Sequence, residues 1–95
     1  MEQKYYIVRG QNSGVFAGNI KERNGSEVLM ENVRRLWYWD GACTISQLAQ
    51  EGTSKPYNCK FAVPVDEILI IDAIEIDTCT KKAEDSIKGV FVWKK

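Results

Sequence analysis

The stretch Lys21-Glu22-Arg23-Asn24-Gly25-Ser26-Glu27-Val28-Leu29 carries the clearest short-range structural signal in this chain of 95 residues. A tight type I′ turn needs positive φ at both central residues, and an Asn-Gly pair adopts that conformation at little cost. The stretch therefore predicts a β-hairpin that turns at Asn24-Gly25 and pairs residues 21–23 with residues 27–29. Such a hairpin indicates an antiparallel sheet.

Residues before this turn predict two further strand segments. Val15 to Arg23 forms the first arm of the hairpin, with Gly18 as a bulge or a point of close approach. Residues 5–8 are aromatic and β-branched and lead into a turn cluster at residues 10–14. These two segments are expected to pair as neighbouring strands.

The second arm of the hairpin runs from Glu27 towards Trp39, with an irregularity at Glu31-Asn32. Strict alternation divides its apolar residues between two faces, with Leu29, Val33, Trp37 and Trp39 on one face and Val28, Met30, Leu36 and Tyr38 on the other. Both faces are apolar near the end of the strand. This pattern is typical of a strand buried on both sides, or of one with an interface or pocket on one side.

Two short helices are predicted in the second half of the chain. Thr44 is followed three residues later by a glutamine, which is a capping-box pattern, and predicts a helix near residues 44–51. A second helix is expected near residues 80–88, with Thr78 or Thr80 as its N-cap.

Further strands are predicted at residues 59–65, where Pro64 marks an edge or a break, at residues 68–76 and at residues 90–93. The fold class is therefore α+β and mainly β, with about five or six strands. The strands are expected to form a small antiparallel sheet or a partly closed barrel. A chain of this length is expected to form a single domain over residues 1–95.

Composition narrows the classes of function. The chain has thirteen basic and thirteen acidic residues and no net charge, so a nucleic-acid partner is not expected. The chain lacks histidine, which is the commonest general base and metal ligand, and its three cysteines form no C-x-x-C pair. We therefore expect no metal and no other cofactor. The number of cysteines is odd, and the sequence shows no signal peptide and no apolar run long enough to cross a membrane. We therefore expect a cytoplasmic protein without a membrane partner.

The run from Arg34 to Ala42 holds two of the three tryptophans and allows three interpretations. It is a core strand, a recognition surface in which rings stack on a planar ligand while arginine binds an anionic group, or a protein interface. Thr44 lies at a helix N-terminus, where backbone N–H groups either receive an anion or are satisfied by the threonine itself. The candidate ligand-binding residues are Arg34, Arg35, Trp37, Tyr38, Trp39 and Thr44.

No set of residues predicts catalysis. Asp72 lies on the opposite face of the predicted 68–76 strand from Glu75 and Asp77, so the three carboxylates do not converge on a metal. The cysteines lack a histidine to activate them, and buried structural thiols are the favoured interpretation. The protein is therefore not expected to be an enzyme.

Three motifs follow one another along the chain, namely V-F-A-G at residues 15–18, the Asn-Gly turn, and R-R-L-W-Y-W-D-G-A at residues 34–42. With these motifs the chain resembles a family of small uncharacterised proteins of phages, prophages and bacteria. Shorter matches at residues 46–49, 51–52 and 59–61 extend the resemblance over most of the chain. It implies an accessory role in a phage or bacterial host and assigns no functional residues.

Two functions are expected from these observations. The first is non-enzymatic binding or sequestration of a host factor or a small anionic, nucleotide-like ligand through the arginine and aromatic side chains. The second is a structural or interaction module in which the aromatic strand forms a homo-oligomer interface.

Overall fold

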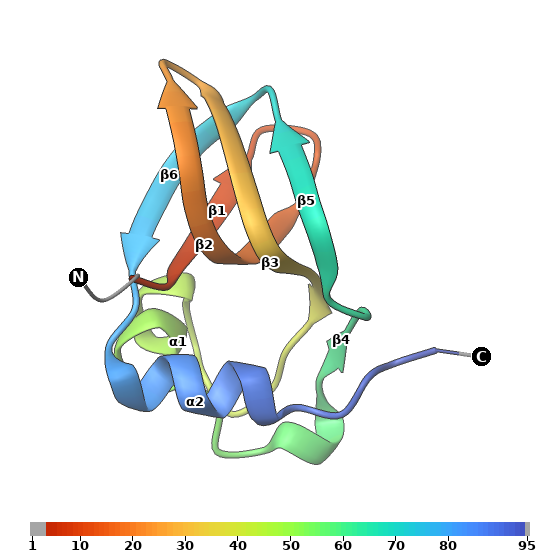
Figure 1. The fold of residues 1–95 in the computed structure, drawn as a ribbon. Helices are drawn as coiled ribbons and strands as arrows, with labels where there is room; N and C mark the ends of the chain where they lie inside the picture. The colour runs from red at the N-terminus through yellow and green to blue at the C-terminus, as the bar shows by residue number, and fades with distance from the viewer. Residues whose placement is uncertain (1–3, 95) are drawn as a thin grey trace.

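A computed structural model describes residues 4–94, which form a curled antiparallel sheet with two helices at one end (Figure 1). In chain order the elements are β1 (Tyr6–Gly10), β2 (Val15–Asn24), β3 (Glu27–Tyr38), α1 (Ile45–Glu51), the 3₁₀ helix η1 (Pro56–Asn58), β4 (Lys60–Phe61), β5 (Val65–Ile70), β6 (Ala73–Thr78) and α2 (Lys81–Gly89). The predicted α+β, mainly β class is confirmed. The sheet is curled but not closed into a barrel.

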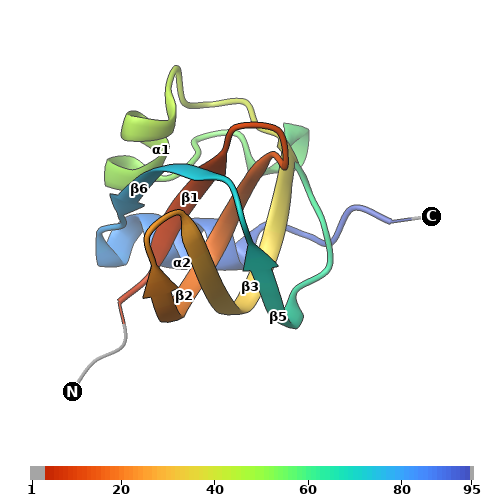
Figure 2. The ribbon, with the colours of Figure 1, turned by 90° about the horizontal axis from the view of Figure 1, so that it is seen from above.

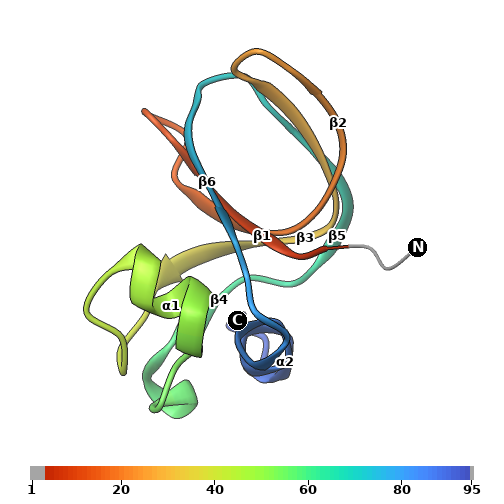
Figure 3. The ribbon, with the colours of Figure 1, turned by 90° about the vertical axis from the view of Figure 1, so that its left-hand side faces the viewer.

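Strand β3 is the organising strand of the sheet. The strand order is β4-β3-β2-β1-β6, and β5 also pairs with β3. Along β3, residues 28–33 pair with β5, whereas Leu36 and Tyr38 pair with β4. The curl is visible from above (Figure 2) and from the side, where α1 and α2 lie together beyond one end of the sheet (Figure 3).

Part of the curled sheet, including β1, is buried on both faces, and this produces two apolar clusters. The cluster beneath the helices contains Tyr5, Ile7, Ala17, Leu36, Leu48, Ala49, Cys59, Phe61, Ile87 and Val90. The cluster enclosed by the strands contains Val8, Phe16, Val28, Met30, Val33 and Ile70. Neighbours in sequence such as Ile7 and Val8 belong to different clusters, as alternation along a strand requires.

The predicted hairpin is present, but it turns one residue later than expected. Asn24 pairs with Glu27, which leaves Gly25 and Ser26 as the two central residues. Of these only Gly25 has positive φ, at 61°. Positive φ at the first central position alone is the requirement of a type II′ turn, so the predicted type I′ turn at Asn24-Gly25 is wrong.

Both predicted irregularities in the hairpin are confirmed. The register between β2 and β3 shifts at Gly18, where an added Cβ would lie 2.8 Å from the Cα of Val33. Only glycine permits the two strands to approach so closely. Asn32 has φ of 49°, the one positive φ at a non-glycine residue within residues 4–94.

The predicted strand at residues 68–76 is wrong, because the chain turns at Ile71-Asp72 and divides it into β5 and β6. The backbone oxygen of Asp72 accepts a hydrogen bond from the N–H of Gln11, at 2.9 Å, which brings the turn against the β1–β2 loop. Only distant residues supply this constraint, and the local sequence gives no sign of it.

Two other predicted strands also differ from the structure. The segment at residues 59–65 is interrupted before Pro64, so that its first part is the two-residue β4 and Val65 begins β5. The segment at residues 90–93 forms only an isolated parallel bridge between Val92 and Phe61.

Both predicted helices are confirmed, together with their caps. The hydroxyl of Thr44 accepts a hydrogen bond from the N–H of Gln47, and that of Thr80 accepts one from Ala83. The Gln47 side chain completes the first cap by accepting from the N–H of Cys43 at 2.7 Å. Neither helix within residues 4–94 has the length and apolar character required to cross a membrane.

Arg34 joins the sheet to the helical end of the molecule. Its side chain is 3% exposed, and its five N–H groups donate to five backbone carbonyls, those of Phe61, Ala62, Ile87, Val90 and Phe91, at 2.9–3.4 Å. The guanidinium also lies 5.5 Å from the centre of the Phe61 ring. One side chain therefore holds β4, the end of α2 and the segment after α2 against β3.

The carbonyls around Arg34 stabilise its charge without a carboxylate. Burial lowers the pKa of Arg34, but a guanidinium stays protonated in proteins. The carbonyl of Ile87 lies in the last turn of α2, where the helix dipole favours a cation. Arginine suits the position because its planar fork presents five donors in fixed directions.

We predict that Arg34→Ala lowers the free energy of unfolding by about 3–5 kcal/mol, because several buried carbonyls lose their only side-chain donor. Arg34→Lys should lower it by about 2 kcal/mol, since an ammonium cannot reproduce the fork. Urea unfolding followed by circular dichroism measures both. Arg35→Ala is the matched control and should stay within about 1 kcal/mol of the parent. A fully stable Arg34→Lys protein would contradict the structural role.

Two carboxyl groups lie close together on one face of β6. Glu75 and Asp77 are two residues apart on the strand, and one oxygen of Asp77 is buried without a hydrogen-bond partner among residues 4–94. Burial, with a hydrogen bond and like charge from Glu75, raises the pKa of Asp77 to about 6. The folded state therefore binds this proton more tightly than the unfolded chain, whose group has a pKa of 3.8.

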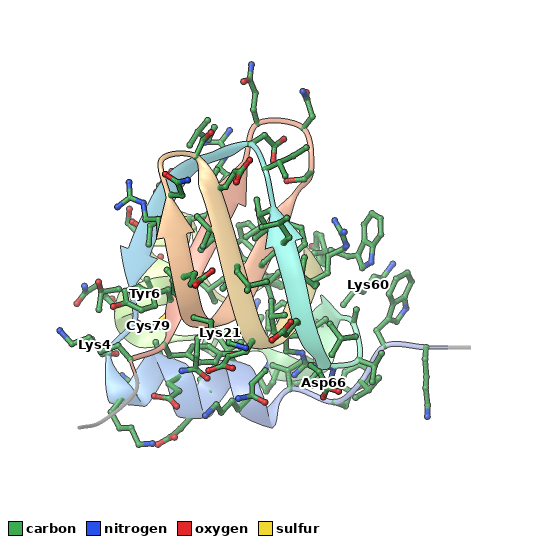
Figure 4. The ribbon with its side chains drawn as sticks, turned by 45° about the horizontal axis from the view of Figure 1, so that its top comes forward. Lys4, Tyr6, Lys21, Lys60, Asp66 and Cys79 are labelled. Atoms are coloured by element: carbon green, nitrogen blue, oxygen red, sulfur yellow. The ribbon has the colours of Figure 1, made fainter. Side chains whose placement is uncertain are left out.

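The stabilisation linked to this proton is complete below pH 3.8 and is lost as the pH rises through about 6. We predict that Asp77→Asn raises the free energy of unfolding at pH 7.5 by about 1–2 kcal/mol and gives no gain at pH 4. Urea unfolding at a series of pH values tests this. Asp66→Asn, which neutralises an exposed carboxylate of β5 (Figure 4), is the control and should show no such pH dependence. An equal gain at both pH values would contradict the assignment.

Candidate functional site

The fold separates the six predicted ligand-binding residues into three settings. Arg34 is buried, Thr44 caps a helix, and the other four lie around the end of β3, namely Arg35, Trp37, Tyr38 and Trp39. The side chain of Trp37 is 62% exposed and that of Tyr38 is 52% exposed. The aromatic run is therefore not a core strand at these two positions, and it forms part of the surface.

Arg34 and Thr44 do not belong to the candidate site. All five donors of Arg34 are engaged by backbone carbonyls inside the protein, so none is left for a ligand. The hydroxyl of Thr44 accepts the N–H of Gln47 at 3.0 Å and has the structural role of an N-cap. For Thr44, this geometry favours the alternative in which the threonine itself satisfies the helix end.

Arg35 is held between two aromatic rings. Its guanidinium carbon lies 4.5 Å from the centre of the Phe16 ring and 5.6 Å from that of Trp37. Phe16 is the cross-strand partner of Arg35, and Trp37 follows two residues along the same strand, so alternation brings all three to one face. The side chain donates one hydrogen bond, from Nη1 to the carbonyl oxygen of Ser13. The other guanidinium donors are available to an anionic group.

A surface groove runs beside this arginine, between the β1–β2 loop and the end of β3. Its volume is about 440 Å³, and it is lined by Asn12, Ser13, Gly14, Val15, Arg35, Leu36, Trp37 and Trp39. Trp39 is half-buried and packs against the apolar cluster beneath the helices. The groove therefore combines a fixed cation with two indole rings, one anchored in the core and one largely exposed.

The loop wall of this groove is fixed from a distance by Asp72. Its carboxylate accepts hydrogen bonds from the N–H of Asn12 at 2.7 Å and from the hydroxyl of Ser13 at 2.6 Å. Hydrogen bonds from Ser13 and Asn12 lower the pKa of Asp72. Because the Ser13 carbonyl in turn accepts from Arg35, Asp72 positions the groove's cation through one intermediate residue.

Sequence reasoning did not identify Ser13 and Asp72 as parts of the site. Residues 10–14 are recognisable as a turn cluster, but their partner is 59 residues away in the sequence. Phe16, the inner ring against Arg35, is likewise recognisable only as an apolar strand residue. No local signal distinguishes it from the other buried residues of β2.

Tyr38 lies beyond the groove, at an irregularity in the sheet. The register between β3 and β4 shifts between Leu36 and Tyr38, where a single step on β4 leads from Phe61 to Lys60. Such a bulge sets two residues of one strand opposite one residue of its partner. Strict alternation, which separates Trp37 and Tyr38 onto opposite faces, therefore does not hold at this end of β3.

Neither Ser13 nor Cys79 is activated as a nucleophile in this structure. The Ser13 hydroxyl donates to a carboxylate of lowered pKa, which is a weak base and does not activate a nucleophile. Burial raises the pKa of Cys79 to about 12, so this thiol is not a nucleophile at neutral pH. Stacking on indole and pairing with guanidinium remain the interactions that the groove offers a ligand.

Comparison with known proteins gives one match. No curated protein and no solved structure matches the chain significantly. A family model described as a domain of unknown function (DUF6948) matches residues 3–87, which is most of the chain. The protein therefore belongs to the DUF6948 family.

Proposed function

We propose that this protein is a non-enzymatic binding protein whose groove holds a small, planar, anionic ligand such as a nucleotide. The observation that carries the proposal is the placement of Arg35 between Phe16 and Trp37 with most of its donors free. A planar ring can stack on the exposed face of Trp37 while the guanidinium binds a phosphate or carboxylate.

The rigidity of the groove supports a binding role. Phe16 is fully buried and Ser13 is held by Asp72, so Arg35 is already in place before a ligand arrives. A preorganised cation loses little conformational entropy on binding, and this favours affinity. The resemblance to phage and prophage proteins suggests an accessory protein that sequesters such a ligand, or a host factor, in a bacterial cytoplasm.

A second candidate function is a homo-oligomer interface formed by the aromatic end of β3. It is favoured by the exposure of Tyr38, which lies outside the groove and next to exposed Trp37. Adjacent exposed aromatic side chains are typical of protein interfaces. Sedimentation equilibrium of the parent and of Tyr38→Ala distinguishes this function, since a monomeric parent would exclude it.

We predict that adenosine 5′-monophosphate, used as a probe, binds the parent protein and binds Trp37→Ala about ten-fold more weakly, because base stacking is lost. Arg35→Met should weaken binding by a similar factor, because it keeps much of the apolar packing but removes the charge. Isothermal titration calorimetry measures both affinities. Tyr57→Ala removes an aromatic ring that is 69% exposed on η1 and should leave the affinity unchanged. No binding to the parent, or equal binding to all variants, would overturn the proposal.

A further inference from the structure

Three chain segments lie side by side, and the first of them, the end of β3, also lines the groove. Tyr38 at the end of β3 pairs with Lys60 of β4. Phe61 of β4 forms a parallel bridge with Val92, and its carbonyl oxygen accepts the N–H of Trp93 at 2.9 Å. The end of β3, strand β4 and residues 91–93 are therefore neighbours, although they are far apart in the sequence.

Several side chains of these segments lie outside the cluster beneath the helices. Leu36 and Phe61 are both buried in that cluster, whereas Trp37 and Lys60 next to them are exposed. The Arg35 guanidinium lies against the Trp37 ring, and Lys60 of β4 projects to the side of the sheet (Figure 4). The ammonium of Lys60 lies 5.5 Å from the centre of the Trp93 ring. We call this surface the basic–aromatic face, defined by Arg35, Trp37, Lys60 and Trp93.

The charge near this face differs from the charge of the whole chain. Residues 33–39, 53–65 and 86–94 contain two arginines and four lysines and no carboxylate, and of these lysines Lys88 pairs with Glu84 of α2 at 2.6 Å. Asp40, Asp66 and Asp85 border these segments; the carboxylate of Asp40 accepts hydrogen bonds from Asn58 and from the N–H of Gly41, and that of Asp85 pairs with Lys81. Buried Arg34 adds a positive charge that no carboxylate among residues 4–94 pairs with. A chain without net charge thus has a basic end.

From this arrangement we propose that the basic–aromatic face binds single-stranded nucleic acid. Two exposed rings, on Trp37 and Trp93, provide stacking surfaces for unpaired bases, and Arg35 and Lys60 beside them are placed to pair with the phosphates. Aromatic platforms combined with a basic track are the features by which proteins bind single strands. The inference rests on the proposed function, because the nucleotide in the groove becomes one unit of the strand.

Geometry and charge favour this occupant over the alternatives. The face extends over three neighbouring segments and carries two exposed rings, whereas one mononucleotide has a single base to stack. A duplex keeps its bases stacked on each other and has no free base faces to place on the rings. An acidic peptide would pair with Arg35 and Lys60, but it would not place a planar base on each of the Trp37 and Trp93 rings. The absence of net charge argues against a generic nucleic-acid binder but does not describe this local surface.

The test is fluorescence anisotropy with labelled (dT)₁₂ and (rU)₁₂ in 50 mM salt, and with a DNA duplex of the same length. One or both single strands should bind at least about ten-fold more tightly than adenosine 5′-monophosphate and than the duplex. With two or three phosphates contacted, the slope of log affinity against log salt should be about −1.4 to −2.1. Comparing (dT)₁₂ with (rU)₁₂ distinguishes DNA from RNA as the source of the strand.

Variants outside the groove separate this inference from the proposed function. Trp93→Ala and Lys60→Ala should each weaken single-strand binding at least about five-fold and leave mononucleotide binding unchanged. Lys82→Ala removes an equal charge from an exposed position on α2 and should have no effect on either. Circular dichroism of each variant confirms that it is folded.

Each outcome bears on the inference. If the mononucleotide binds and the single strands bind no more tightly, or if Trp93→Ala and Lys60→Ala have no effect, the inference is overturned and the proposed function stands. If neither probe binds, both are overturned. Equal affinity for duplex and single strand would show that charge alone is responsible, which also overturns the inference.

Discussion

The structure depends on one buried cation and the carbonyls that surround it. Arg34 donates to five backbone oxygens in β4, the loop after it, α2 and the segment after α2. Buried carbonyls without donors cost free energy, and a buried guanidinium without acceptors costs more. Each side therefore stabilises the other, and Arg34 links the helical end of the molecule to β3. The apolar cluster that contains Leu36, Phe61 and Ile87 packs in the same region.

The candidate site follows from the same constraint. With Arg34 turned inward, alternation turns Arg35 to the opposite side, where it meets Phe16 and Trp37. The second wall of the groove depends on Asp72, which fixes the β1–β2 loop from the turn between β5 and β6. The core and the candidate site are thus built from adjacent residues of one strand, and neither can shift its register without moving the other.

Local signals were sufficient for the parts of the fold that local interactions determine. The hairpin around Gly25 and the caps at Thr44 and Thr80 depend on residues within a few positions, and sequence reasoning found them. The turn at Asp72, which divides the predicted 68–76 strand, depends on the distant residue Ser13. The different roles of Arg34 and Arg35 depend on backbone carbonyls up to 57 residues away. Nothing in Arg34-Arg35 itself states which one is buried, because both residues flank apolar positions and both carry the same charge.

The balance of charge also has to be judged in three dimensions. Thirteen basic and thirteen acidic residues cancel in the sequence, but basic residues are in excess in the segments at residues 33–39, 53–65 and 86–94. Surface ion pairs such as Lys21–Glu67 and Lys81–Asp85 engage carboxylates on β5 and α2, away from the end of β3. A charge buried at low dielectric is screened less than one in water, so Arg34 contributes to the potential at the adjacent surface although no ligand touches it. The residue that joins the sheet to the helical end therefore also adds to the positive potential of the adjacent surface.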